Sequence, residues 1–176
     1  YWANYPLRDI HAGTSPEDVY KSIRYRTRAA VYRAAGLFFR DAENDRVLAC
    51  KLISKVLERQ FHDASDKKSY GSWEKYINKE SELDENWREF IGMTLIIILE
   101  EFPDKVPAAL KSRMEEALVR AARGAADRNV SADYSNVAIK SAFLMEYVGK
   151  KMNLPDVYRV GHQKVRDIYD LYHKHQ

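Results

Sequence analysis

Residues 90–99 read FIGMTLIIIL and are apolar at nearly every position. A helix that is apolar all round has to be buried on most of its sides. A second stretch of this kind, residues 137–148, is interrupted only by Lys140, Ser141 and Glu146. We therefore expect two helices inside the molecule, each surrounded by other helices.

Six helices are predicted, at residues 16–39, 44–61, 84–101, 107–128, 135–150 and 155–173. Ser15 is a good N-cap with Pro16 at the first helical position, and Pro103 marks the end of the third helix. The second, fourth and sixth helices each have one apolar stripe at 3.6-residue spacing. In the sixth, this spacing predicts that the following residues face inward: Val157, Val160, Val165, Ile168, Leu171 and Tyr172.

Amphipathic helices thus alternate with helices that must be buried. Up-down bundles bury similar stripes on every helix, whereas concentric α/α barrels need this alternation of inner and outer helices. The pattern predicts an all-α fold made of about three helical hairpins of an α/α toroid, which is an incomplete ring. An open arc leaves an apolar flank exposed, where the remaining hairpins of the toroid or a partner chain would bind.

Composition narrows the classes of function. The 176 residues form one expected domain, residues 1–176, with an N-terminal extension at residues 1–14. Charges of both signs are interspersed at a net +3, which does not favour a nucleic-acid partner, and no apolar run is long enough for a membrane span. We find no metal-binding motif and no phosphate loop, so no metal or cofactor is predicted.

The compartment is unknown. Cys50 is the only cysteine, so no disulfide can form within the chain. The sequon at residues 129–131 (NVS) mildly favours a secreted protein, and a first residue other than Met suggests processing or a fragment.

The connections from an outer helix to the next inner helix, about residues 61–83 and 129–134, are where a toroid has its cleft. Polar and aromatic side chains gather at these connections, and Trp and Tyr suit stacking on sugar rings while Asn and Asp suit hydrogen bonds to hydroxyl groups. We expect substrate binding by Tyr70, Trp73, Asn86, Trp87 and Asn136, with Asp84 and Tyr134 as catalytic residues.

Two chemistries and several structural roles remain open at these positions. A glycoside hydrolase needs two carboxylates, for which Asp84, Glu85, Glu89 and Asp133 are candidates by position. A polysaccharide lyase instead needs a base such as Tyr134 with an Asn or Arg that neutralises an acidic sugar. Structurally, Asp84 and Asn136 could cap helices and Trp87 could belong to the core.

Several stretches resemble a known family. They are residues 70–73 (YGSW), 84–92 (DENWREFIG), 128–129 (RN) and 134–139 (YSNVAI). Together they resemble a family of fungal, largely uncharacterised proteins with a six-hairpin glycosidase-like (α/α)6 toroid. The resemblance implies part of a carbohydrate-active protein, a glycoside hydrolase or polysaccharide lyase with a glycan in a concave cleft. The alternative is a non-catalytic helical-hairpin module that binds a glycan or a protein.

Overall fold

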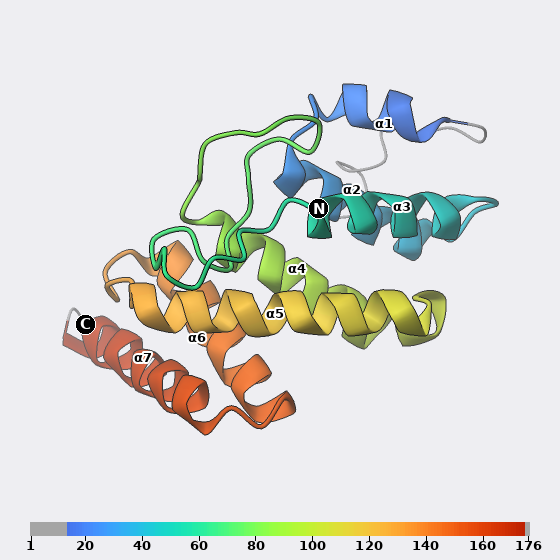
Figure 1. Ribbon diagram of the computed structural model, residues 1–176. Helices are drawn as coiled ribbons and strands as arrows, with labels where there is room; N and C mark the ends of the chain where they lie inside the picture. Colours follow the sequence, from blue (N-terminus) through green and yellow to red (C-terminus); the bar gives the residue numbers. More distant parts are fainter. Residues whose placement is uncertain (1–13, 175–176) are drawn as a thin grey trace.

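The computed structural model describes residues 14–174, and every regular element in this range is a helix, which confirms the all-α prediction (Figure 1). The expected N-terminal extension lies outside the described residues except for Thr14. The helices are α1 (Pro16–Ser22), α2 (Thr27–Arg40), α3 (Asp45–Leu57), α4 (Trp87–Glu101), the 3-10 helix η1 (Pro103–Lys105), α5 (Ala108–Arg128), α6 (Ser135–Lys151) and α7 (Pro155–Lys174).

The first predicted helix, residues 16–39, is wrong as a single element. It is divided into α1 and α2, and Arg24 and Tyr25 between them have positive φ angles of 51° and 54°. The loop after α3 causes the break, because its backbone pairs with this segment. The Thr27 N–H donates to the Lys75 carbonyl, and the Ile77 N–H donates to the Tyr25 carbonyl.

The second predicted helix also ends too late, since α3 stops at Leu57 instead of residue 61. Gln60 forms an isolated bridge with Trp73, so the loop again takes the backbone groups that a longer helix would use. The four later helices agree with their predicted bounds to within three residues.

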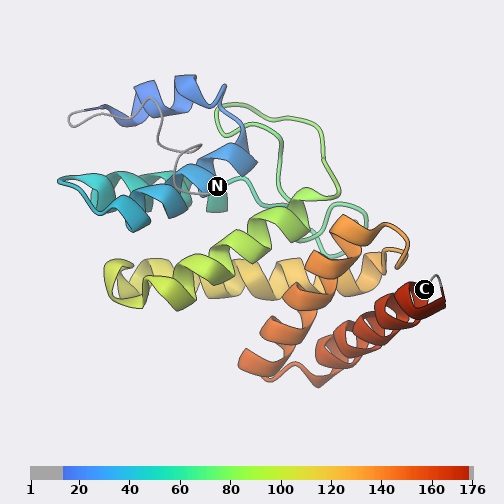
Figure 2. The same cartoon turned by 180° about the vertical axis from the view of Figure 1, so that it is seen from behind.

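The helices pack in two layers. In one layer α4 packs between α2 and α6, and in the other α5 packs between α3 and α7. Figure 1 shows α3 and α5 in front of α2 and α4, and Figure 2 shows the reverse, with α6 and α7 side by side. These contacts agree with the predicted alternation of inner and outer helices. Closure into a toroid remains a prediction.

The inner helices α2, α4 and α6 run parallel to one another. Near their first turns, Phe90 of α4 lies between Arg28 of α2 and Lys140 of α6. Near the other end, Phe38 of α2 stacks on Phe102, which follows α4, with ring centroids 5.9 Å apart. All three helices therefore begin at the same end of the molecule.

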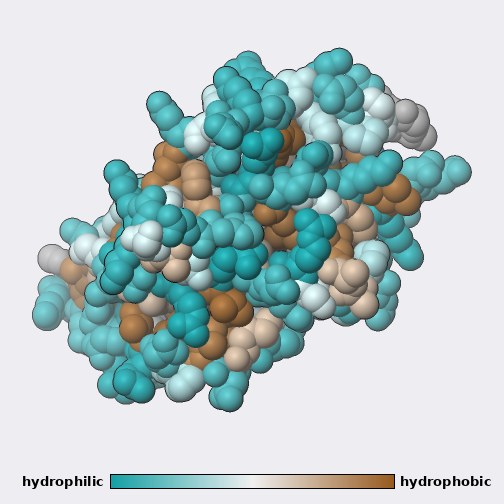
Figure 3. Space-filling model, viewed as in Figure 1, coloured by the Kyte–Doolittle hydropathy of each residue, from teal (hydrophilic) through white to brown (hydrophobic). Residues whose placement is uncertain are grey.

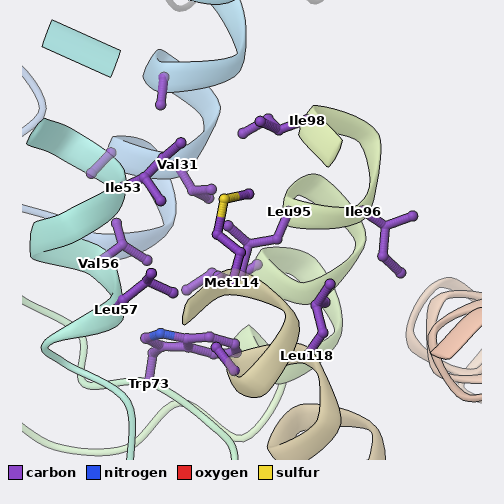
Figure 4. Close-up of a cluster of buried hydrophobic side chains, with 14 of the residues drawn as sticks. Val31, Ile53, Val56, Leu57, Trp73, Leu95, Ile96, Ile98, Met114 and Leu118 are labelled. Atoms are coloured by element: carbon purple, nitrogen blue, oxygen red, sulfur yellow. The ribbon is translucent and has the colours of Figure 1, made fainter. Parts of the chain in front are cut away.

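The hydrophobic core lies between the two layers, and all the labelled side chains in Figure 4 except Trp73 come from α2, α3, α4 and α5. Trp73, from the loop between α3 and α4, inserts beside Leu57, Met114 and Leu118. The outer face is mostly polar, and Figure 3 shows only small hydrophobic areas separated by hydrophilic side chains.

The long loop between α3 and α4 is fastened to the helices by buried contacts. Arg88 donates three hydrogen bonds of 2.8–3.1 Å to the carbonyl oxygens of Lys68 and Tyr70. Gly124 of α5 permits this approach, because a Cβ there would lie 2.1 Å from the Tyr70 oxygen. The loop is thus part of the folded layer structure despite its lack of regular elements.

Two expectations about burial are wrong. In α6, predicted to be buried on most sides, Ile139 and Phe143 are exposed. In α7, Val165 and Tyr172 are exposed although the apolar spacing predicted that they face inward. Both errors have the same cause, because no described helix packs on this side of the α6/α7 pair.

Candidate functional site

A hydrogen-bonded cluster lies where α4 and α6 begin. The Asn86 side-chain amide, just before α4, donates from Nδ2 to the Tyr134 hydroxyl oxygen at 3.2 Å. Asn86 Oδ1 in turn accepts from Arg128 Nη2 at 2.9 Å. The fold therefore brings together two of the predicted site residues, Asn86 and Tyr134, which are 48 positions apart in the sequence.

Arg128 connects this cluster to two carboxylates. It is the last residue of α5, and its Nη1 donates to the Glu85 carbonyl oxygen at 2.8 Å. Its guanidinium also lies 3.6 Å from the Glu85 carboxylate and 3.5 Å from the Glu89 carboxylate. Because Arg128 has donors only, it obliges Asn86 to present its oxygen and so directs the Asn86 amide nitrogen to Tyr134.

Glu89 is the most perturbed acid in the cluster. Its side chain is 0% exposed, and among the described residues neither carboxylate oxygen has a hydrogen-bond partner. Burial raises the pKa of Glu89 to about 7, against the lowering effect of the nearby Arg88 and Arg128 charges. A carboxyl group that gains or loses its proton near neutral pH beneath a polar cluster is typical of functional sites.

A row of cations and aromatic rings adjoins the cluster on the inner face. The Arg28 guanidinium lies 5.0 Å from the Phe90 ring centroid and 6.0 Å from the Trp87 ring. Lys140 Nζ lies 4.8 Å from the same Phe90 ring and also donates to the backbone carbonyl of Asn136. The inner face at this end is therefore positively charged and aromatic.

The remaining predicted polar residues have partly structural roles. Asp84 accepts the backbone N–H of Asn86 at 3.1 Å and so shapes the turn that leads into α4, although Asn86 and not Asp84 is the N-cap residue. Asn136 is exposed in the first turn of α6, one turn from Lys140. Trp87 is almost fully buried and belongs to the core, the structural role weighed for it from the sequence.

The expected ligand contact by Trp73 is contradicted by the structure. The Trp73 side chain is 0% exposed, since the Gly/Ser-rich loop folds inward and places the ring in the core. Tyr70 is half-buried, and its backbone carbonyl is held by Arg88 on the side of α4 that faces α5. No contact joins either residue to the Asn86–Tyr134 cluster within the described part of the chain.

Sequence reasoning missed two residues of this site. Arg128 appeared only within a stretch that resembles a known family, and Arg28 was not among the predicted site residues. Glu89 was a candidate by position alone. The spacing of Asn86 and Glu89, three residues apart at a helix start, was a usable signal because it places both on one side of the first turn.

Other parts of the described chain hold little that competes with this site. A groove of about 590 Å³ runs along α3 beside Tyr20, Cys50 and Lys105, and contains none of the predicted site residues. Among residues 14–174, no group of three His, Cys, Asp or Glu side chains is placed to hold a metal ion. No described helix is long and apolar enough to cross a membrane.

Fold and site together define an all-helical domain of layered hairpins with a polar, partly buried cluster at the shared end of its inner helices. The chain belongs to the family described as Domain of unknown function (DUF8769), whose model matches residues 14–176. No curated protein and no solved structure matches the chain.

Proposed function

We propose that this chain forms part of a carbohydrate-active α/α-toroid protein and that the Asn86–Tyr134–Arg128 cluster contacts a glycan. The proposal is supported by the position of the cluster, at the end where outer helices lead into inner ones. Tyr134 is 46% exposed, so its hydroxyl group is accessible to a ligand, and Arg28 and Lys140 give the neighbouring face a positive charge. These features suit an acidic polysaccharide better than a neutral one.

The observation that carries the proposal is the hydrogen bond from Asn86 to Tyr134. Asn86 Nδ2 donates to the phenol oxygen and orients it, and the O–H group of Tyr134 remains available for a ligand. Tyr134 thereby suits the base of a lyase, which removes the proton beside a uronate carboxyl group. Elimination then forms a carbon–carbon double bond as the bond to the glycosidic oxygen breaks and that oxygen leaves with a proton.

Hydrolysis has less support from the geometry. A hydrolase would need two carboxylates that reach the scissile bond, and Glu89, the carboxyl group with the raised pKa, is sealed beneath Arg128. Because burial keeps the Glu89 carboxyl group away from a substrate, it also favours a second candidate function. This is a non-catalytic module that binds a glycan through Tyr134 and its neighbours.

The test is a panel of neutral and uronate-containing polysaccharides, with binding and cleavage measured in parallel. New reducing ends are produced by both hydrolysis and elimination. Ultraviolet absorbance of an unsaturated uronate is produced by elimination only. We expect binding of acidic polymers and loss of elimination in Tyr134→Phe. Tyr172→Phe is the matched control, because Tyr172 is 51% exposed and lies on α7.

Each outcome separates the candidates. Elimination that depends on Tyr134 supports the lyase, and new reducing ends without unsaturation, lost in Asp84→Ala, favour the hydrolase. Binding without cleavage favours the module. If no polysaccharide binds or is cleaved, or if Tyr134→Phe behaves as Tyr172→Phe does, the proposed site is wrong.

A further inference from the structure

Helix α7 has a second apolar stripe on the exposed flank beside α6, next to the face that packs against the rest of the described chain. The stripe follows spacings of four, three, four and three residues, and all its side chains are half-exposed or exposed: Tyr158, His162, Val165, Tyr169 and Tyr172. This is the a/d spacing of a helix that packs along another helix. Within the described residues, α6 contacts this stripe through Gly149 beside Tyr158 and through Glu146 beside His162, and the remaining side chains of the stripe are exposed.

The neighbouring face of α7, toward α5 and α6, is already occupied. Val157 and Lys164 are buried there, Gly161 packs against the backbone at Met145, and Ile168 packs beside Val137 and Ala138. Packing against α6 therefore accounts for only part of the apolar surface of α7. An amphipathic helix that packs on one side of a domain needs one such face, and α7 has a second apolar stripe beside it.

We propose that the exposed stripe of α7 is the interface with a second copy of this chain, in which the two α7 helices pack antiparallel about a two-fold axis near Val165. This proposal does not depend on the glycan-binding function. It identifies the partner expected on the open flank as an identical chain.

The arrangement of the stripe supports a two-fold partner. Tyr158 and Tyr172 each lie seven residues from Val165, and His162 and Tyr169 lie three and four residues from it. Two antiparallel copies therefore place Tyr158 of one chain opposite Tyr172 of the other, twice. A closed two-fold contact needs a self-complementary surface of this kind. The small Val165 side chain at the centre allows the helices to approach closely.

The charges beside the stripe have the same symmetry. Arg159 lies about one and a half turns before Val165 and Asp170 about one and a half turns after it, along the same edge of α7. In the antiparallel arrangement Arg159 of each chain faces Asp170 of the other. Both residues are exposed, and no hydrogen bond or ion pair within the described residues joins them to another side chain.

Helix α6 extends the surface. The Glu146 carboxylate contacts His162 Nδ1 at 2.8 Å and so links the exposed side of α6 to the stripe on α7. Ile139 and Phe143, both exposed, lie on this side of α6, two turns and one turn before Glu146 respectively. The two helices thus present a continuous apolar flank, a kind of surface that in soluble proteins marks an interaction site.

The other flank of the molecule is covered. α1 lies along the α2/α3 pair, at the opposite side of the molecule from α7 in both ribbon views (Figures 1 and 2), and its Val19 is fully buried. A head-to-tail contact between the α6/α7 flank and the α2/α3 flank of another copy would have to displace α1. The symmetric contact through α7 displaces nothing.

The experiment is sedimentation equilibrium over a range of protein concentrations. We expect a monomer–dimer equilibrium and at least about a tenfold rise in the dimer dissociation constant for Val165→Glu. Val47→Glu is the matched control, because Val47 is a helical valine of α3 that is 56% exposed, and Val165 is 41% exposed. Circular dichroism establishes that both variants are folded.

A charge exchange tests the antiparallel register. Arg159→Asp alone should weaken the dimer, and the double variant Arg159→Asp with Asp170→Arg should restore it. If the protein is a monomer at every concentration, the proposal is wrong, even if another partner binds the α6/α7 flank. It is also wrong if Val165→Glu weakens the dimer no more than Val47→Glu does. A dimer weakened by Arg159→Asp but not restored in the double variant overturns the antiparallel arrangement.

Discussion

Arg88 and Glu89 are neighbours at the start of α4, and both side chains are completely buried, yet their surroundings differ. Arg88 points to the long loop, where Nε and Nη2 donate to two backbone carbonyl oxygens. Glu89 has no hydrogen-bond partner among the described residues and has only the Arg128 charge at 3.5 Å. Within a single turn, α4 thus has a fold-holding side, where Arg88 binds the long loop, and a second side, where the buried Glu89 carboxyl group has no hydrogen-bond partner among the described residues.

The largest effect is expected on the fold-holding side. Trp73→Ala removes a fully buried indole from the core between α3 and α5, and should lower the free energy of unfolding by about 3–5 kcal/mol. Urea unfolding measures this loss. Trp73→Phe keeps most of the ring and should cost clearly less. Equal stability of the alanine variant and the wild type would show that the loop does not contribute to the core.

Arg88→Met should cost about 3 kcal/mol, somewhat less than loss of the indole. Methionine retains much of the side-chain volume but leaves the carbonyl oxygens of Lys68 and Tyr70 buried without their donor. Hydrogen exchange should show faster exchange in the long loop than in α6. An unchanged loop in this variant would contradict the fastening role of Arg88.

On the other side, Glu89→Gln should increase stability at neutral and higher pH. The unfolded state loses the Glu89 proton near the ordinary pKa of 4.5, and the folded state loses it near 7. Between these values the folded state binds more protons, so stability falls as pH rises. A shift of this size corresponds to about 3 kcal/mol at pH values above 7 and to none below 4.5.

Denaturant midpoints of the wild type and Glu89→Gln across this pH range measure the difference. We expect the two proteins to be similar in acid and to diverge as pH rises through neutrality, with the glutamine variant the more stable. Parallel pH curves for the two proteins would mean that the Glu89 carboxyl group is solvated or paired.

The smallest effect belongs to Tyr134→Phe, which removes one partly exposed hydrogen bond with Asn86. The expected loss of stability is below about 1 kcal/mol, as for most surface positions. A stability loss as large as that of Arg88→Met would place Tyr134 on the fold-holding side. The comparison between the two sides would then fail.

The same contrast explains what the sequence could predict. Helix type and bounds from α4 to α7 followed from apolar spacing and caps, which are local. The break between α1 and α2 did not, because Thr27 pairs with Lys75 and Tyr25 pairs with Ile77, in each case across about 50 positions. Trp73 was misplaced for a related reason, since a Gly/Ser-rich loop has the composition of an exposed segment whether or not it folds inward.

At the site, Asn86 and Tyr134 were both predicted at connections where an outer helix leads into an inner one, and their side chains form a hydrogen bond. The sequence did not predict which of two adjacent charged residues, Arg88 or Glu89, would find partners. Helical position sets the direction of a side chain but not the groups that meet it there. The role of Arg128 likewise depends on a contact 42 positions away in the sequence.

The parallel course of the inner helices has an electrostatic consequence. Each helix carries a partial positive charge at its N-terminus, and α2, α4 and α6 all begin at the end that holds Tyr134. The three dipoles therefore add there and oppose one another nowhere along the inner face. The inner layer therefore favours anions at this end, whereas α5 runs the opposite way and ends at Arg128, so the outer layer has its partial negative charge there.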